Sequence, residues 1–497
     1  MKKFLLYTVG CLMALTSCDL DINDNPNYPD GGAVTSDLIF PAAENYVADV
    51  LGDQMFNYGG FFAQYFEQRP EANQYNDLAE LHLDEASNLF DRPYIYLYAG
   101  ALQDLNEILS RSDNTSDIFA CTVLRAYTFA LVVDNLDMAP YTEALQGSAN
   151  PSPKWEEGQV VYEGVLAEMD EAEKNLSDVP MTLTDPMLGK NLAQWKGFAN
   201  ALRLRMYLRL IDGGINAAEY QAKVKTLLAK NEFFSGNVAW DVYSNAEGQY
   251  NPWYDGRRAL GTMNHVAAYP ITTYMLNTGD PRISFGMLPN AAEGQYVGQI
   301  PGSKTKMGNA DWAGSWKNDN VSTINYESMI AAPIYLFAQS ELQFLIAEAQ
   351  LRFNNNDGAA KAAYEAGVSA DFALKRAGSA AGFLAETRTN WDAQGSTTAK
   401  LNLIYMQKWV ALFMVDHMEA WSEIRRTDVP ATSPSTAEQI FKDPTSYNAG
   451  DMIIPAVNYI QAGGLCKRVP YPARTRQLNS NPPEAKLLSD RVFWDAK

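Results

Sequence analysis

Residues 195–230, WKGFANALRLRMYLRLIDGGINAAEYQAKVKTLLAK, contain two helical patterns joined by a turn. In the first pattern, apolar side chains recur every three or four residues: Trp195, Phe198, Leu202, Met206 and Leu210. That spacing is the period of one face of an α-helix. Two adjacent glycines, Gly213 and Gly214, then favour a turn. The stretch therefore predicts a helix, a short link and a second helix.

A second helix pair of similar length is predicted at residues 341–374. Apolar residues lie at Leu342, Leu345, Ala349 and Phe353, and a polar link follows from Asn354 to Gly358. Both spans are close to the ~34 residues of a tetratricopeptide repeat, although the consensus of that repeat is absent. Such units bury their apolar faces by stacking on one another. We predict an all-α fold in which tetratricopeptide-type helix pairs form a curved scaffold.

Three further stretches have a helical period, around residues 116–131, 162–176 and 399–424, and we expect the last to be the longest helix. His417 lies on its apolar stripe and is expected to be a core histidine. Arg425 and Arg426 follow this stretch, where cations favour a helix C-terminus. We expect these two arginines to form structural ion pairs.

Two long stretches lack a helical period. Residues 233–332 are rich in Gly, Asn, Pro and aromatic residues, and a stretch of this length exceeds a single loop. We predict an irregular, loop-rich insertion with short elements of its own. The proline-rich C-terminal stretch predicts loops that wrap around the helical body.

The N-terminus, MKKFLLYTVGCLMALTSC, has the layout of a secretory signal. Lys2 and Lys3 precede an apolar run of about a dozen residues, too short to span a bilayer. The ending Leu15-Thr16-Ser17-Cys18 resembles a bacterial lipobox, which implies cleavage before Cys18 and acylation of its sulfur. We predict a signal peptide at 1–17, a flexible tether at 18–37 and a helical domain at 38–497. An ordinary cleaved signal or a signal anchor remains the alternative.

The formal charge of −20 argues against nucleic acid as a partner, because nucleic-acid binding depends on basic surfaces. No apolar run beyond residue 18 approaches the ~18 residues of a membrane-spanning helix. Cys121 and Cys466 are too few for a disulfide framework, although one bridge between them is left open.

No catalytic or metal-binding motif stands out. The three histidines, His82, His265 and His417, lie far apart, and no Cys/His cluster has zinc spacing. Neither a phosphate-binding glycine loop nor a G-x-S-x-G elbow is present. We therefore expect a binding protein that is not an enzyme and needs no metal or cofactor. A helical glycosidase stays open, because a pair of carboxylates cannot be recognised from sequence. A calcium loop in the tether is disfavoured, because Asp24 stands where such a loop needs glycine.

Aromatic residues beside amides and glycines suggest carbohydrate binding. A flat ring covers the apolar face of a sugar while polar side chains bond its hydroxyls. Seven candidates occur in such contexts: Tyr58, Tyr65, Tyr75, Trp253, Tyr254, Trp312 and Trp316. For each one, packing in the core is the alternative interpretation.

Several segments together resemble the SusD/RagB outer-membrane lipoproteins of Bacteroidetes. The acidic residues after Cys18 and the stretch DINDNPNYP at 21–29 are similar to the start of that family. AYTFALVVDNLDMAPY at 126–141, EAWSEIRRTDVP at 419–430 and RVPYP at 468–472 resemble further family motifs. Asp137-Met138 stands where the family usually has Gly-Asp, and Ala473 to Arg476 lies where the family has a glutamate.

The resemblance implies a fold, a place and a partner. The fold is a helical domain with tetratricopeptide units, anchored by lipid to the outer membrane and facing the cell exterior. The partner is a SusC-like TonB-dependent transporter, to which the lipoprotein passes an oligosaccharide. Two alternatives for the function remain: a peptide as the ligand, and a scaffold whose repeats hold another protein.

Overall fold

The computed structural model describes residues 34–308, 312, 316–461 and 463–496, and this part of the chain is mainly helical. The predicted signal peptide, Cys18 and the tether up to residue 33 lie outside the described residues. The helices in the first half are α2 Ser36–Val50, α3 Phe56–Phe62, α4 Asn76–Ala79, α5 Asp91–Ile95, α6 Gln103–Arg111, α7 Thr115–Leu136, α8 Gly158–Lys174, α9 Leu192–Asp212 and α10 Ala217–Lys230. Those in the second half are α11 Pro252–Ala259, α12 Tyr269–Thr278, α13 Ile283–Gly286, α14 Gln339–Phe353, α15 Asp357–Leu374, α16 Ala381–Ala385, α17 Thr397–Leu412, α18 His417–Thr427, α19 Ala437–Lys442 and α20 Ala473–Leu478.

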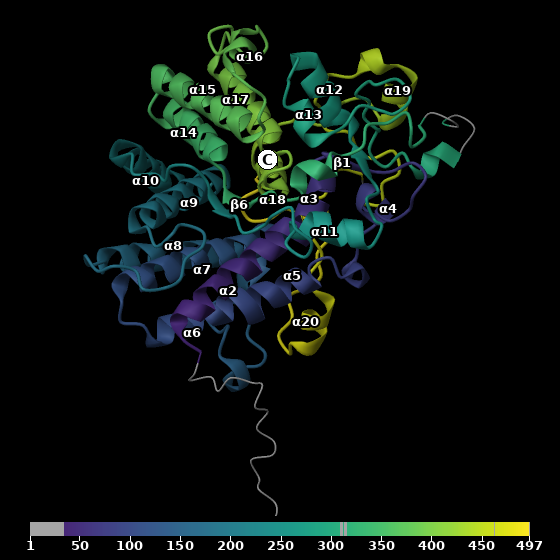
Figure 1. Cartoon of the computed structure of the whole chain (residues 1–497). Coiled ribbons are helices and arrows are strands. Elements are labelled where there is room, and N and C mark those ends of the chain that lie inside the picture. The colour runs from purple at the N-terminus through teal and green to yellow at the C-terminus, as the bar shows by residue number, and fades with distance from the viewer. Residues whose placement is uncertain (1–33, 309–311, 313–315, 462, 497) are drawn as a thin grey trace, which may run out of the picture.

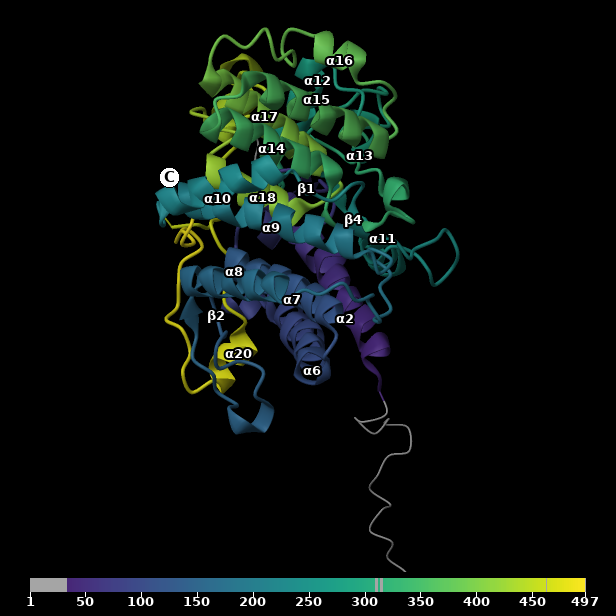
Figure 2. The same ribbon diagram turned by 90° about the vertical axis from the view of Figure 1, so that its left-hand side faces the viewer.

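Helix pairs form the body of the molecule, which confirms the predicted fold class. The pairs α7/α8, α9/α10 and α14/α15 pack closely, and α17 packs on α14. Figures 1 and 2 show these helices in successive layers, with α2 and α6 below and α16 at the far end. The pairs begin at side-chain caps: Asn191 accepts from the backbone N–H groups of Ala193 and Gln194, and Asn356 accepts from that of Ala359.

Helix α9 is buried on nearly all sides, so its arginines lie inside the protein. Arg205 donates to Glu341 of α14 at 2.6 Å. Arg209 donates to Asp134 of α7 at 2.5 Å and to Glu419 of α18 at 2.6 Å. Each buried cation thus meets a carboxylate from another layer, as burial of charge requires. The ion pairs join α7, α9, α14 and α18 at the centre of the stack.

The prediction of one long helix over residues 399–424 is wrong. Helix α17 ends at Leu412, Met414 adopts a positive φ of 61°, and α18 begins at His417. Asp416 caps the new helix by accepting from the N–H of Glu419 at 3.0 Å. The longest described helix is α7, with 22 residues.

The expectation for His417 is confirmed, and the expectation of structural ion pairs is confirmed for Arg426 but wrong for Arg425. His417 is fully buried; its Nδ1 donates to the Phe56 carbonyl at 2.8 Å and its Nε2 accepts from the Met414 N–H at 3.0 Å. Burial lowers the pKa of His417 to about 3, so the ring is neutral. Arg426 forms structural ion pairs with Glu348 and Glu423. Arg425 lacks a carboxylate within ion-pair distance among the described residues and instead lies 3.6 Å above the Trp421 ring.

Among the described residues, α7 is long and apolar enough to cross a membrane by length and composition. The sequence-based expectation that no stretch beyond residue 18 is long and apolar enough to span a membrane is therefore wrong for this helix. Its most apolar window is 89% buried inside the protein, so α7 is the core helix of this fold. Cys121 lies on α7, and both it and Cys466 are buried free thiols, which excludes a bridge between them here.

Residues 233–332 contain short elements tied to the helical body by two antiparallel ladders. Strand β4 (Val238–Trp240) pairs with β6 (Ile334–Phe337), which joins the two ends of the region. Strand β5 (His265–Ala267) pairs with β1 (Phe66–Gln68), which docks the region on the aromatic N-terminal segment. A third ladder joins β2 (Met138–Ala139) to β3 (Glu156–Glu157). Figure 1 shows α12, α13 and α19 together, on the side of the molecule away from α9 and α10.

Candidate functional site

Five of the seven predicted binding aromatics lie in the main hydrophobic core: Tyr58, Tyr65, Tyr75, Trp253 and Tyr254. Trp253 is fully buried between the rings of Phe66 and Tyr326, which stack on it at 5.6 and 4.9 Å. Protein atoms cover these ring faces, so they are not available to a sugar in this structure. For these five residues, the alternative of core packing describes what the structure shows.

The other two candidates, Trp312 and Trp316, lie together. Phe441 of α19 stacks on the Trp312 ring with a centroid distance of 4.2 Å and an interplanar angle of 10°. Trp316 lies 6.0 Å from Trp312 and 5.5 Å from Phe441. We call these three residues the Trp312 cluster. It belongs to a small hydrophobic core separate from the main one, together with Ile300, Ile440 and Ile453.

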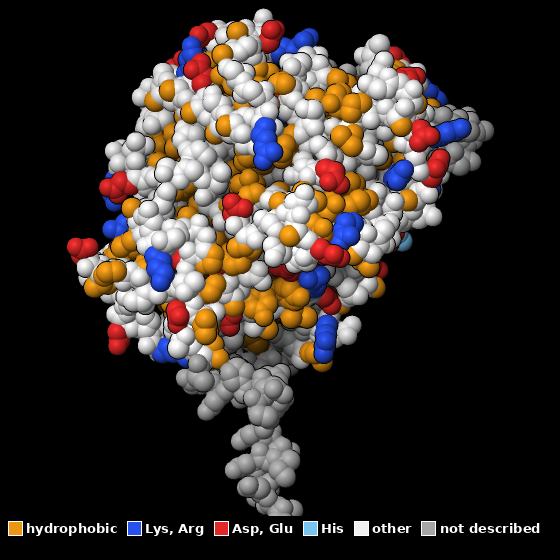
Figure 3. All heavy atoms as spheres, viewed as in Figure 1, with side chains coloured by type: hydrophobic (Ala, Val, Ile, Leu, Met, Phe, Trp, Pro, Cys, Tyr) orange, Lys and Arg blue, Asp and Glu red, His pale blue; other side chains and the backbone are white. Residues whose placement is uncertain are grey.

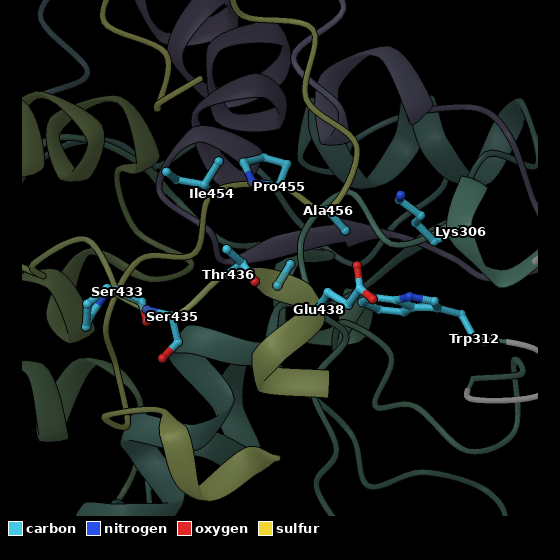
Figure 4. A pocket seen from close by; sticks show the side chains of 11 residues that line it. Lys306, Trp312, Ser433, Ser435, Thr436, Glu438, Ile454, Pro455 and Ala456 are labelled. Carbon is cyan, nitrogen blue, oxygen red and sulfur yellow. Dashed lines mark hydrogen bonds between the residues drawn. The ribbon is translucent and has the colours of Figure 1, made fainter. Parts of the chain in front are cut away.

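A cavity of about 340 Å³ opens beside the Trp312 cluster. Its lining comes from three segments of the chain: Lys306 and Trp312, the stretch Ser433 to Glu438, and the stretch Ile454 to Ala456. Figure 4 shows Lys306, Glu438 and Trp312 on one side of the cavity and Ser433 and Ser435 on the other, with Ile454, Pro455 and Ala456 along a third edge. The volume lies in the range of small-molecule sites.

The α19 wall of the cavity is held by a capping box. The Thr436 hydroxyl accepts from the Gln439 N–H at 3.2 Å, and the Gln439 side chain accepts from the Thr436 N–H at 2.9 Å. The opposite edge is fixed by Gln64, whose side-chain oxygen accepts from the N–H of Ile453 at 2.8 Å. Local hydrogen bonds thus place hydroxyl groups and apolar atoms around one opening.

Glu438 provides the one carboxylate among the described lining residues. It accepts from Lys442 at 2.7 Å, and this hydrogen bond holds the pKa of Glu438 below its ordinary value. Glu438 therefore stays ionised and serves as a hydrogen-bond acceptor. Lys306 on the same side supplies a donor, and Ser433, Ser435 and Thr436 carry hydroxyls. An aromatic ring surrounded by such groups can hold a neutral polyol such as a sugar.

Sequence reasoning missed the C-terminal half of this lining. Residues 433–438 lie more than a hundred residues from Trp312, so no local pattern links them. One signal was present: Thr436 followed three residues later by Gln439 is a capping-box pattern. It predicts a short helix, but not the cavity beside it.

Within the described ranges, no group of three or more His, Cys, Asp or Glu side chains has the arrangement of a metal site. On the face shown in Figure 3, acidic and basic side chains are interspersed. That face therefore presents no continuous basic surface of the kind that nucleic acids require.

Comparisons with known proteins agree on one family. A family model named SusD-like and described as starch-binding and associating with the outer membrane matches residues 31–445. A SusD homologue from Bacteroides vulgatus is 19% identical with a TM-score of 0.68, over 94% of this chain and 95% of that chain. A chitin-binding SusD homologue from Flavobacterium johnsoniae is 20% identical with a TM-score of 0.68, over 92% of this chain and 97% of that chain. At such identities these structures establish the fold, and no curated protein sequence matches the chain.

Proposed function

The chain belongs to the SusD-like family, described as starch-binding and associating with the outer membrane, and from this membership we propose that it captures oligosaccharides at the cell surface. The membership also confirms the resemblance that the sequence motifs indicate. In the proposed role, the protein binds a nutrient glycan without changing it covalently and delivers it to an outer-membrane transporter.

One observation carries the proposal: Trp312, one ring of the aromatic cluster, lines a cavity that is rich in hydroxyl groups. Phe441 stacks on one face of the Trp312 ring and holds it in place, and the Trp312 side chain, which is 3% exposed, forms part of the cavity wall. A ring held in place gives stacking area at low cost in conformational entropy. Ser433, Ser435, Thr436 and Glu438 supply hydrogen-bonding groups for the rim of a sugar.

The same cavity favours binding over hydrolysis. A glycosidase needs two carboxylic groups on either side of the scissile bond, and its general acid needs a raised pKa. Glu438 is the one described carboxylate in the lining, and Lys442 shifts its pKa in the opposite direction. Incubating the protein with the bound glycan should therefore release no shorter products.

The position of the Trp312 cluster also favours glycan capture over a purely scaffolding role. A scaffold would use the surface of the stacked helix pairs. The cluster instead lies beside α19, away from α9 and α10 (Figure 1). Peptide remains the alternative ligand, since indole rings and hydroxyl groups bind peptides as well.

Membrane attachment and delivery complete the proposed role. The lipobox-like ending at Cys18 supports an acylated N-terminus, and the following acidic residues support export to the cell exterior. A lipid on Cys18 would hold the body near the membrane surface. A SusC-like TonB-dependent transporter is the proposed partner, as family membership suggests.

A screen of starch-type, chitin-type and peptide ligands against a soluble form that begins at residue 19 tests the proposal. We expect an oligosaccharide to bind, and Trp312→Ala to weaken that binding about tenfold, the upper end of what one stacked ring contributes. Lys223→Ala, on α10, serves as the control and should bind like wild type. Equal binding by the Trp312→Ala variant would place the site elsewhere, and selective peptide binding would replace the glycan.

A further inference from the structure

A second cavity, of about 240 Å³, lies close to the first one. Its lining comes from four segments, and the structure describes all of their residues: 83–85, 459–461, 470–471 and 486–489. Tyr459 at its rim is 55% exposed, which is unusual for so large an aromatic side chain. The ring stacks on His82 with a centroid distance of 4.1 Å.

The chemistry of this cavity repeats that of the first. The Tyr459 ring stacks on the ring of His82, as the Trp312 ring stacks on that of Phe441. Polar side chains of four kinds surround it: the carboxylate of Asp84, the amide of Gln461, the ammonium of Lys486 and the hydroxyl of Ser489. Such a set matches the apolar face and the hydroxyl rim of a sugar unit.

One strap of chain connects the two cavities. Ile454 to Ala456 borders the first cavity, and Tyr459 to Gln461 borders the second. Ala456 and Tyr459 are three residues apart, so their Cα atoms lie at most roughly 11 Å apart. The two cavities are therefore bordered by one short, continuous segment of the chain.

Hydrogen bonds fix the strap between the openings. The N–H of Val457 donates to the Gly302 carbonyl at 3.1 Å, and the N–H of Tyr459 donates to the Glu80 carbonyl at 3.0 Å. The Glu80 carboxylate in turn accepts from the hydroxyl of Thr305, the residue next to Lys306 of the first cavity. Figure 1 shows α4, which ends just before Glu80, on the same side of the molecule as α19.

We propose that the two cavities are subsites of a single site, and that the ligand is an oligosaccharide long enough to contact Trp312 and Tyr459 together. This inference rests on the proposed function and adds the length of the ligand. Once one end is bound, the second contact becomes intramolecular and gains from a high effective concentration. Affinity should therefore rise with chain length until both rings are covered.

Calorimetric titration with a series from disaccharide to octasaccharide, of the glycan type that binds best, tests this proposal. We expect Tyr459→Ala to weaken binding of the long members roughly fivefold to tenfold and to leave the disaccharide within about twofold of wild type. Trp312→Ala should weaken binding at every length. Tyr459→Phe keeps the ring and should behave like wild type, which controls for an effect on folding.

The outcomes distinguish a failure of the second subsite from a failure of the proposed function. If Tyr459→Ala has no effect at any length while Trp312→Ala weakens binding, the second subsite is refuted and the proposed function stands. Equal losses for short and long ligands would place Tyr459 in the same subsite as Trp312 and also refute two subsites. If the wild-type protein binds no member of any glycan series, both proposals fail.

Discussion

Replacing Arg426 by Met should destabilise the protein strongly, because Arg426 neutralises buried carboxylates. Its guanidinium donates to Glu348 at 2.7 and 2.8 Å, to Glu423 at 2.6 Å and to Asp212 at 2.6 Å. Burial alone would raise the pKa of Glu348, but Arg426, followed by Arg352, lowers it from 4.5 to about 2. That difference corresponds to roughly 3 kcal/mol. It agrees with the ~3–5 kcal/mol usually lost when one partner of a buried ion pair is removed.

The loss of unfolding free energy in Arg426→Met should depend on pH. Because the pKa of Glu348 is depressed in the folded state, its contribution is fully present above pH 4.5 and is lost as the pH falls towards 2. The difference in unfolding free energy between wild type and Arg426→Met should therefore be about 3 kcal/mol at pH 7 and about half of that at pH 3.

Urea unfolding followed by tryptophan fluorescence measures both values. Arg258→Met provides a matched control, since Arg258 pairs with Asp255 at 3.0 Å on the surface, where such pairs contribute ~0–1 kcal/mol. A loss below about 1 kcal/mol for Arg426→Met at pH 7, or a loss that does not change with pH, would refute the reasoning.

Three further predictions concern packing, thiols and the anchor. Gly197→Ala should lower the unfolding free energy by about 1–3 kcal/mol, because a Cβ there would meet the backbone nitrogen of Phe234 at 2.2 Å. Gly382→Ala is the control: a Cβ there would meet no atom within 4 Å, so the unfolding free energy should change by less than about 1 kcal/mol. Burial raises the pKa of both Cys121 and Cys466, the latter to about 12. A thiol reagent at pH 8 should therefore label neither cysteine in the native soluble form and both in urea. Labelling of either cysteine in the native protein, or no labelling in urea, would contradict the presence of two buried free thiols. Cys18→Ala should remove the protein from the outer-membrane fraction, and retention of this variant on the cell surface would contradict a lipid anchor.

The helix pairs could be predicted because their apolar residues keep the helical period over long stretches. The break between α17 and α18 could not, because Phe413 and His417 continue the apolar stripe across it. The cap at Asp416 fixes the break, and it looks in the sequence like one more polar residue of a long helix. The partners of Arg205 and Arg209 were equally hidden, since they lie on helices more than 70 residues away.

The candidate site was predictable only in part, because Trp253 and Trp312 have similar sequence contexts but different surroundings in the fold. Trp253 follows Asn251 and looked like a binding aromatic beside an amide. In the structure, the Asn251 side chain accepts from the Trp253 N–H at 3.0 Å and caps α11, while the indole packs in the core. Trp312 has a comparable context but lines a cavity. Both side chains are buried, and what distinguishes Trp312 is the cavity formed beside α19, which depends on the tertiary fold.

The structure of the protein in complex with its oligosaccharide tests the central claim most directly. The account predicts a sugar ring in the cavity beside α19, with its apolar face within about 4 Å of the Trp312 indole and its hydroxyls bonded to groups of the Ser433 to Glu438 stretch. A sugar bound elsewhere on the molecule, with the Trp312 cavity empty, would contradict it.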